Sequence, residues 1–146
     1  MTQHKTYMNG EGLSIESESQ ILNFLFEHLD QYGDTKQDIQ KAIDYALKRN
    51  DKQGGILHIA MDNQNIIGAV VINKTGMEGY IPENILVYIA THNQYRGKGV
   101  GKKMMQMAIE QTEGNIALHV EPDNPAKKLY EKLGFTNKYL EMRLNK

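Results

Sequence analysis

The residues whose type and spacing most clearly suggest a chemical role are three glycines at alternate positions, Gly97, Gly99 and Gly101. They lie between an apolar run at 85–90 and the start of an amphipathic stretch, which begins at Val100. Glycine lets the backbone turn tightly and places no Cβ in the way of a ligand. The first N–H groups of a following helix have no partner inside the helix and carry the positive end of its dipole. Such a turn binds anions, most often phosphate. We therefore expect a phosphate-binding turn between a strand and a helix.

The spacing of these glycines excludes two common phosphate-binding motifs. A Walker A loop requires a glycine at the position of Arg96 and a serine or threonine at the position of Lys103. A dinucleotide-binding fingerprint requires a third glycine where this chain has Lys102 or Met104, depending on the register. The chain therefore lacks residues that the mechanism of each motif needs, and neither motif is present.

The spacing that fits is Arg96-x-x-Gly99-x-Gly101, and on it the chain resembles the GCN5-related N-acetyltransferase (GNAT) superfamily. The signature also fits in an earlier register from Gln94, but the helix begins too late for that register. A second segment, PAKKLYEKLGF at 125–135, is similar to the family pattern N-x-x-A-x-x-L-Y-E-x-x-G-F. The resemblance thus rests on two separate motifs.

This resemblance, which spans about 84–135, implies a fold and a cofactor. The implied fold is α/β: a mixed, mostly antiparallel sheet flanked by helices, splayed between its fourth and fifth strands where the pantetheine arm of acetyl-CoA inserts. Counting back from the family's tyrosine, the family's asparagine falls on Asp123, and Asn124 stands one residue later. The residues expected to bind acetyl-CoA are Ile89, Ala90, Thr91, Arg96, Gly97, Lys98, Gly99, Val100, Gly101, Lys102 and Asn124.

Acetyl transfer to an amine needs a base for the amine and a proton for the departing thiolate. By the resemblance Tyr130 is the acid, since a phenol with a pKa of ~10 stays protonated at neutral pH and can donate to a thiolate whose conjugate acid has a pKa of ~8.5. His119 is the candidate base because it titrates near neutrality. Glu83, Glu121 and water are its rivals, and the pattern also fits a structural histidine at 119 and a core tyrosine at 130.

The function we expect is an N-acetyltransferase in which a primary amine attacks acetyl-CoA directly in a ternary complex. Acidic residues in the N-terminal helices favour a small cationic acceptor; they are Glu27, Asp30, Asp34, Asp38 and Asp44. The alternatives are a protein N-terminal or lysine acetyltransferase, an enzyme for longer acyl groups, and a CoA-binding sensor without turnover. A sensor has no use for a proton donor, so Tyr130 favours an enzyme.

Composition sets the class of protein and excludes several partners. A chain of 146 residues that is 40% hydrophobic fits one domain, 1–146, with a core of its own. A net charge of −1 gives no electrostatic reason to expect nucleic acid. The chain has no cysteine, and its five histidines lack the short spacings of a metal site, so we expect neither a thiol nucleophile nor a metal. Residues 1–20 contain no apolar signal region and no apolar run approaches a membrane span, so we expect a cytoplasmic protein.

The expected elements follow from periodicity and caps. Their order is two helices, a hairpin, then strand, helix, strand, helix and strand. The expected positions are an edge strand or loose start in the first ten residues, a helix capped by Ser17 or Ser19, a second opened by Asp34 or Thr35, hairpin strands at 56–61 and 66–73, strands at 85–90, 116–120 and 138–144, a helix from Val100, and one capped by Asp123 or Asn124. An exposed final strand could pair across a homodimer.

Overall fold

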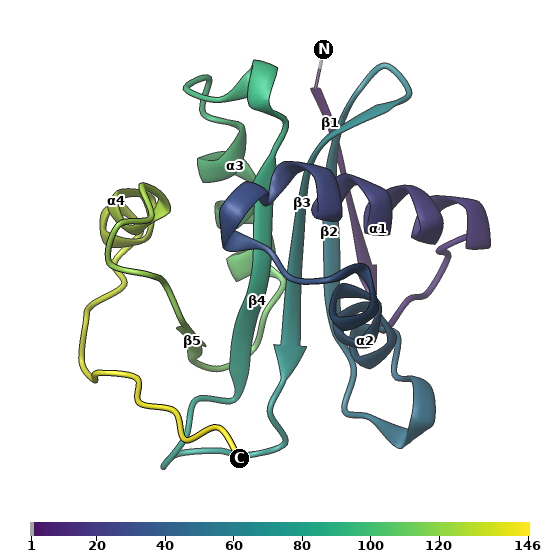
Figure 1. Ribbon diagram of the computed structural model, residues 1–146. Helices are drawn as coiled ribbons and strands as arrows, with labels where there is room; N and C mark the ends of the chain where they lie inside the picture. Colours follow the sequence, from purple (N-terminus) through teal and green to yellow (C-terminus); the bar gives the residue numbers. More distant parts are fainter. Residues whose placement is uncertain (1) are drawn as a thin grey trace.

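A five-stranded mixed sheet with helices on both faces forms the body of the computed structural model, in which residues 2–146 are described (Figure 1). The strands are β1 (Thr2–Met8), β2 (Gly55–Asp62), β3 (Asn65–Lys74), β4 (Asn84–Thr91) and β5 (Ile116–Leu118). The helices are α1 (Ile15–His28), α2 (Lys36–Ala46), α3 (Val100–Glu110) and α4 (Ala126–Lys132), with 3-10 turns η1 (Asp30–Tyr32), η2 (Arg49–Asp51) and η3 (Asn93–Tyr95).

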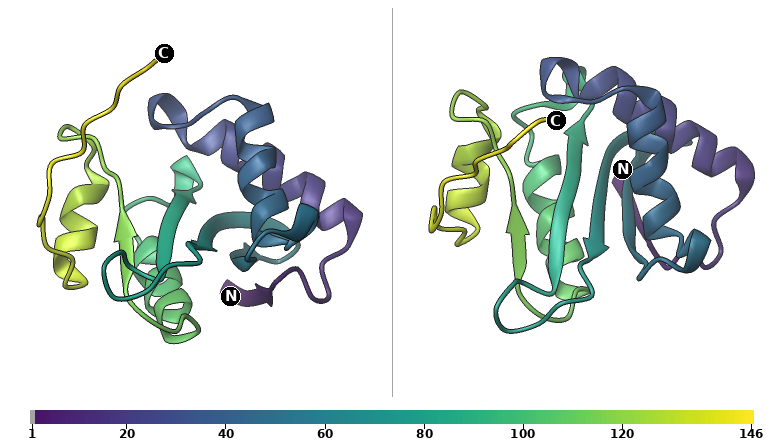
Figure 2. Two further views of the ribbon diagram at one scale, coloured as in Figure 1. Left: turned by 90° about the horizontal axis from the view of Figure 1, so that it is seen from below. Right: turned by 60° about the horizontal axis from the view of Figure 1, so that its bottom comes forward.

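The strands lie in the order β1-β2-β3-β4-β5, antiparallel except for the parallel pair β4 and β5. Helices α1 and α2 cover one face of the sheet, α3 covers the other, and α4 lies beside β5 (Figure 2). The predicted mixed and mostly antiparallel sheet is confirmed. The chain start, left open as a loose segment or an edge strand, is the edge strand β1.

The two N-terminal helices form where the sequence places an apolar stripe behind a capping hydroxyl. Thr35 caps α2 by accepting the Asp38 N–H at 3.2 Å, as predicted. The predicted cap of α1 was wrong: Ser14 is the N-cap and accepts the Ser17 N–H at 3.1 Å. The first turn of α1 carries no buried residue, so the apolar stripe that guided the prediction begins only one turn later.

Strand β4 contains a bulge that decides which face its side chains occupy. Val71 of β3 lies opposite Tyr88, whereas the next residue, Ile72, lies opposite Leu86, so Val87 is an extra residue in β4. One inserted residue moves the following side chains to the other face of the sheet. Leu86 therefore packs in the core under α3, whereas Tyr88 packs in the core under α1 and α2.

The sheet opens between β4 and β5, as the resemblance implied. The two strands pair only from Asn84 with Ile116 to Leu86 with Leu118, and residues 87–91 of β4 continue without a β5 partner. The strand predicted at 116–120 is therefore shorter than expected and stops before His119. The edge of β4 beyond Leu86 therefore has no strand partner, and we call the opening between this edge and the chain after β5 the cleft.

The final strand predicted at 138–144 was wrong. The chain after α4 has no regular secondary structure and ends on the side of the sheet that α1 and α2 cover (Figure 2). A strand needs a hydrogen-bonding neighbour, and the nearest edge, β5, is only three residues long. Four apolar side chains of this segment are 79–91% exposed: Tyr139, Leu140, Met142 and Leu144. Alternating hydrophobicity alone did not indicate whether a partner strand exists.

Candidate active site

The glycine turn between β4 and α3 has the geometry of an anion site. Gly97 and Gly99 have φ values of +78° and +81°, and a Cβ built on either meets no atom within 4 Å. Gly99 is the N-cap of α3, and its carbonyl accepts the first helical hydrogen bond from the Lys103 N–H at 3.1 Å. The N–H groups of residues 100–102 precede that bond and point out of the helix end. Glycine is required here for the backbone conformation and leaves open space beside these donors.

Two of the three lysines of the turn, Lys98 and Lys103, have identified neighbours. Lys98 Nζ lies 5.4 Å from the ring centroid of Tyr95. Lys103 lies near His4, whose pKa is lowered by burial and by the charge of this lysine. Lys103 is therefore directed toward β1. Lys102 is exposed on the first turn of α3, beside Lys103.

The edge of β4 offers main-chain donors to the cleft. His92 donates its N–H to β3 at 2.8 Å. Because the N–H and C=O groups of successive strand residues point to opposite sides, Ala90 also faces β3, while Ile89 and Thr91 face the opened side. The Thr91 carbonyl accordingly accepts a hydrogen bond from Arg96 Nε at 3.4 Å. Of the three expected thioester contacts, those at residues 89 and 91 are the ones directed into the cleft.

Gly101 lies where β4, α3 and α4 meet. A Cβ built on it would be 3.4 Å from Thr91 Oγ1 and 3.4 Å from Leu129 Cδ2. This close approach brings α4, and with it Tyr130, to the glycine turn. Tyr130 is 7% exposed, and burial raises the pKa of its phenol to about 12. Within residues 2–146 its hydroxyl forms no hydrogen bond, so it is free to donate to a ligand.

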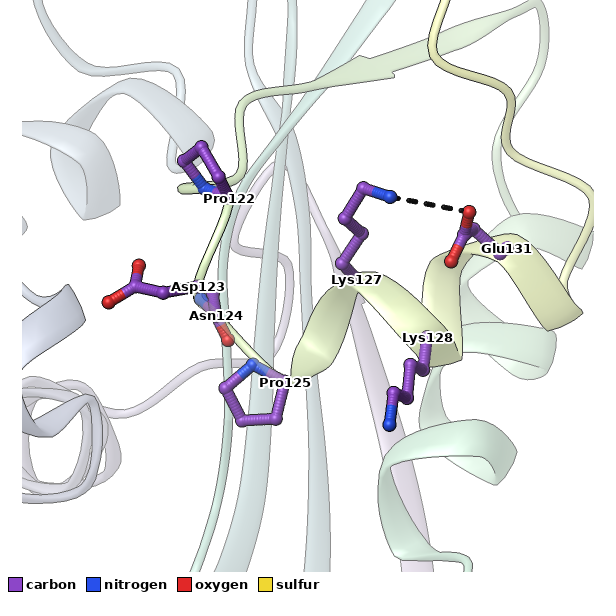
Figure 3. A pocket seen from close by; sticks show the side chains of 7 residues that line it. All are labelled: Pro122, Asp123, Asn124, Pro125, Lys127, Lys128 and Glu131. Carbon is purple, nitrogen blue, oxygen red and sulfur yellow. Dashed lines mark hydrogen bonds and ion pairs between the residues drawn. The ribbon is translucent and has the colours of Figure 1, made fainter.

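A pocket of about 370 Å³ lies at the loop between β5 and α4 (Figure 3). In it, Lys127 and Glu131 point toward each other with 3.4 Å between Nζ and Oε2, while Lys128 points away from them. Asn124 Oδ1 accepts the Ala126 N–H at 2.9 Å, and its amide nitrogen stays available. The N-cap residue of α4 is Pro125, which directly follows the predicted Asp123 or Asn124. The pocket is lined by Pro122, Asp123, Asn124, Pro125, Lys127, Lys128 and Glu131.

The candidate bases lie in different environments. His119 follows the last residue of β5, where the strands diverge; its side chain is 55% exposed, and Nδ1 lies 3.9 Å from Glu141. Glu83 accepts the N–H groups of Asn115 at 2.7 Å and Gly79 at 3.0 Å, which lower the pKa of its carboxyl. Glu83 also precedes β4, at the opposite end of that strand from the glycine turn. Glu121 is exposed in the loop after β5.

Several side chains on the α1–α2 side of the cleft make contacts that the sequence did not indicate. The Tyr88 hydroxyl donates to the Asp34 carboxylate, and the pKa of Tyr88 is raised by burial and by that carboxylate. His28 at the end of α1 is buried, its ring centroid lies 4.3 Å from that of His92, and burial followed by the His92 ring lowers its pKa. The signal for Asp34 was the acidic charge noted in the sequence. Nothing in the pattern indicated its partner.

Among residues 2–146, no three or more histidine, aspartate or glutamate side chains are grouped to hold a metal ion. No helix in this range is both long enough and apolar enough to cross a membrane.

The chain thus combines a mixed sheet that opens between β4 and β5 with a glycine turn at the N-terminus of α3. The chain belongs to the GNAT acetyltransferase family: residues 53–137 match the family model for the acetyltransferase (GNAT) domain. It is similar to N-alpha-acetyltransferase 30 of Schizosaccharomyces pombe, with 32% identity over 82 residues, which cover 53% of this chain and 55% of that protein. The chain thus spans about half the length of this curated relative.

Solved structures share the fold at low sequence identity. The structure of the NatC complex bound to Gag peptide and CoA matches with a TM-score of 0.73 and 20% identity, covering 94% of this chain and 86% of that one. An aminoglycoside 6'-N-acetyltransferase from Acinetobacter haemolyticus matches with a TM-score of 0.70 and 16% identity, covering 99% and 97%. One of these neighbours is bound to a peptide and the other is named for an aminoglycoside, so the likeness supports the fold and leaves the acceptor to the residues of this chain.

Proposed function

We propose that this chain is an acetyl-CoA-dependent N-acetyltransferase whose acceptor is a small cationic primary amine. The observation that carries the proposal is the free N–H row at residues 100–102, placed next to the unpaired edge of β4. The first feature suits the diphosphate of acetyl-CoA and the second suits its thioester arm. Together they orient one ligand along the cleft.

The reaction follows from these donors. The neutral amine nitrogen attacks the thioester carbonyl carbon, a C–N bond forms, and the C–S bond breaks. Main-chain N–H groups at Ile89 and Thr91 stabilise the oxyanion that develops on the carbonyl oxygen. The nitrogen loses one proton and coenzyme A leaves as the thiol, so the proton balance closes within the complex. His119, at the point where the strands diverge, is the proposed base, and water and Glu121 are the alternatives.

Tyr130 acts as a hydrogen-bond donor to the leaving sulfur. With the phenol pKa at about 12 and a thiol pKa of ~8.5, full proton transfer from Tyr130 to the thiolate is uphill by roughly 5 kcal/mol. The net proton therefore comes from the amine, and the phenol stabilises charge on the sulfur while the C–S bond breaks. This role uses the hydroxyl of Tyr130 without requiring its ionisation.

The acceptor class is inferred from charge on the α1–α2 side of the cleft. Tyr88 enters this face of β4 because of the bulge and holds the exposed Asp34 carboxylate, and Asp38 is close enough to raise the pKa of Tyr88 further. Carboxylates beside the thioester edge favour a protonated amine that has a second positive charge. A protein N-terminus is the alternative acceptor, favoured by the 32% identity to an N-alpha-acetyltransferase.

Calorimetry with acetyl-CoA, followed by thiol-release assays, tests this function. The assay panel consists of polyamines, aminoglycosides, amino acids and short peptides with free N-termini. We expect acetyl-CoA to bind and polyamines or aminoglycosides to give the largest kcat/KM. Absence of binding by both acetyl-CoA and CoA overturns the cofactor assignment. Binding without thiol release from any amine identifies a sensor, and turnover of peptides alone identifies an N-terminal acetyltransferase.

A further inference from the structure

The short connection between α1 and α2 touches three different elements around the cleft. We call residues 30–34 the acceptor segment. Asp30 Oδ2 accepts a hydrogen bond from Arg96 Nη2 in the glycine turn at 2.8 Å. The Tyr32 hydroxyl donates to the Asp123 carbonyl, beyond β5, at 3.3 Å. Asp34 accepts from Tyr88 of β4. Every second side chain of this segment is therefore bonded to a different part of the cleft wall.

Arg96 belongs to the turn by sequence, but its side chain points back to the acceptor side. Its Nη2 donates to the His28 carbonyl at 3.1 Å as well as to Asp30, and its Nε donates to the Thr91 carbonyl at 3.4 Å. The His28 carbonyl is at the last turn of α1, where the helix dipole favours a cation. One rigid guanidinium thus joins the end of β4, the end of α1 and the acceptor segment.

We propose that Arg96 and Asp30 couple the two substrate sites, so that acetyl-CoA bound at the glycine turn holds the acceptor segment in place and raises the affinity for the amine. The proposal rests on the proposed function, since it assumes that the turn binds acetyl-CoA. A diphosphate bound by the N–H groups that follow Arg96 fixes the backbone from which the guanidinium extends. That fixed guanidinium then holds Asp30, and Tyr32 and Asp34 are positioned with it.

The backbone conformation of Asp30 depends on neighbouring contacts, of which the hydrogen bond from Arg96 is one. Asp30 has a φ of +54°, a conformation that aspartate tolerates only at some cost and that neighbouring contacts must hold. The ion pair itself is about half exposed, at 49% for Arg96 and 52% for Asp30, so it adds little to global stability. Its loss should therefore appear in the coupling between sites. Such coupling is reciprocal and typically amounts to roughly 5- to 150-fold in affinity.

The variant Asp30→Asn tests the coupling because asparagine also tolerates positive φ and differs only in charge. The matched control is Asp51→Asn, another exposed aspartate with a positive φ of 58°. Three quantities are measured in each protein: the Kd for acetyl-CoA by calorimetry, amide hydrogen exchange at residues 29–35 with and without CoA, and KM and kcat for the best amine of the thiol-release panel. Residue 30 is a positioning residue here, so KM and kcat are reported separately.

In the wild type and in Asp51→Asn we expect CoA to increase protection of residues 29–35 at least several-fold. In Asp30→Asn we expect that increase to disappear, with KM for the amine raised about tenfold and both kcat and the Kd for acetyl-CoA within twofold of wild type. Unchanged or reduced protection in CoA-bound wild type overturns the coupling, and so does an Asp30→Asn protein that behaves like the control. A Kd for acetyl-CoA that weakens in Asp30→Asn also overturns it, by making Asp30 part of the cofactor site. If wild type binds no CoA, the proposed function fails first.

Discussion

The Tyr88 hydroxyl donates a 2.5 Å hydrogen bond to the Asp34 carboxylate, 54 residues away in the chain. The pair exists because the bulge at Val87 turns Tyr88 to the face of α1 and α2, where the connection between those helices carries Asp34. Without the extra residue, Tyr88 would share the α3 face with Leu86. A local irregularity in one strand thus sets the chemistry of the acceptor side.

Asp34→Asn should weaken binding of a cationic acceptor without affecting acetyl-CoA. The asparagine oxygen can still accept from Tyr88, so the variant removes mainly the negative charge. We expect KM for the amine to rise by about tenfold and the Kd for acetyl-CoA to stay within twofold, as measured by thiol release and calorimetry. Glu110→Gln, an exposed change at the far end of α3, is the charge control. An equal KM for Asp34→Asn and this control contradicts a charge-based acceptor site.

Comparing Gly99→Ala with Gly79→Ala should separate the effect of a side chain on ligand binding from its effect on backbone strain. Gly99 and Gly79 both have positive φ, +81° and +75°, and a Cβ at either meets no atom within 4 Å. Alanine at either position should therefore cost a similar ~1–2 kcal/mol in the free energy of unfolding. Only Gly99→Ala should weaken acetyl-CoA, by tenfold or more, because its methyl group enters the space beside the helix N–H groups. Equal acetyl-CoA affinity in the two variants argues against the diphosphate site.

Much of the architecture could be predicted because it depends on patterns among residues that are close in the sequence. The glycine turn, the helix from Val100, the hairpin of β2 and β3 and the cap at Thr35 each depend on neighbouring residues. The failures were of two kinds. Ser14 was missed as a cap because the buried stripe begins a turn later, and the segment 138–144 was predicted as a strand although pairing depends on a partner edge that the segment itself does not encode.

The site could be predicted only in part, for the same reason. The spacing of the glycines predicted the turn between β4 and α3, whereas the contacts of Arg96 with Asp30 and of Tyr32 with Asp123 join positions 66 and 91 residues apart. Charge alone indicated that the N-terminal helices carry carboxylates, without saying which of them reach the cleft. Long-range partners of this kind follow from the tertiary fold.

Tyr130→Phe should lower turnover while leaving acetyl-CoA bound. The ring stays packed against Phe135, at 5.9 Å between centroids, so the change removes only the hydroxyl. We expect kcat to fall on the order of 10²-fold, since a positioned proton or hydrogen-bond donor contributes about that much, with the Kd for acetyl-CoA within twofold. Tyr139→Phe, in the exposed C-terminal segment, is the matched control and should not change kcat. Unchanged turnover in Tyr130→Phe removes this phenol from the mechanism.

Acid should destabilise the fold through a buried histidine between β1 and β2. His58 is fully buried, with Thr6 Oγ1 at 2.7 Å from Nδ1 and His4 Nδ1 at 3.0 Å from Nε2, and burial followed by the neighbouring His4 lowers its pKa from 6.5 to about 4. The folded state therefore binds the proton less tightly than the unfolded state. The stability contribution is complete above pH 6.5 and is lost as pH falls toward 4, by up to ~1.4 kcal/mol per pH unit.

Urea unfolding of wild type, His58→Asn and His119→Asn between pH 7.5 and pH 4 measures how steeply the free energy of unfolding falls as the pH is lowered. His58→Asn should be less stable at pH 7.5 because it loses packing, yet its free energy of unfolding should fall less steeply with acid. The side chain of His119 is 55% exposed, so its variant should keep the wild-type slope. Some slope should remain in His58→Asn because the pKa of buried His28 is also lowered. Parallel curves for wild type and His58→Asn would mean that His58 takes up its proton as easily in the folded protein as in the unfolded chain.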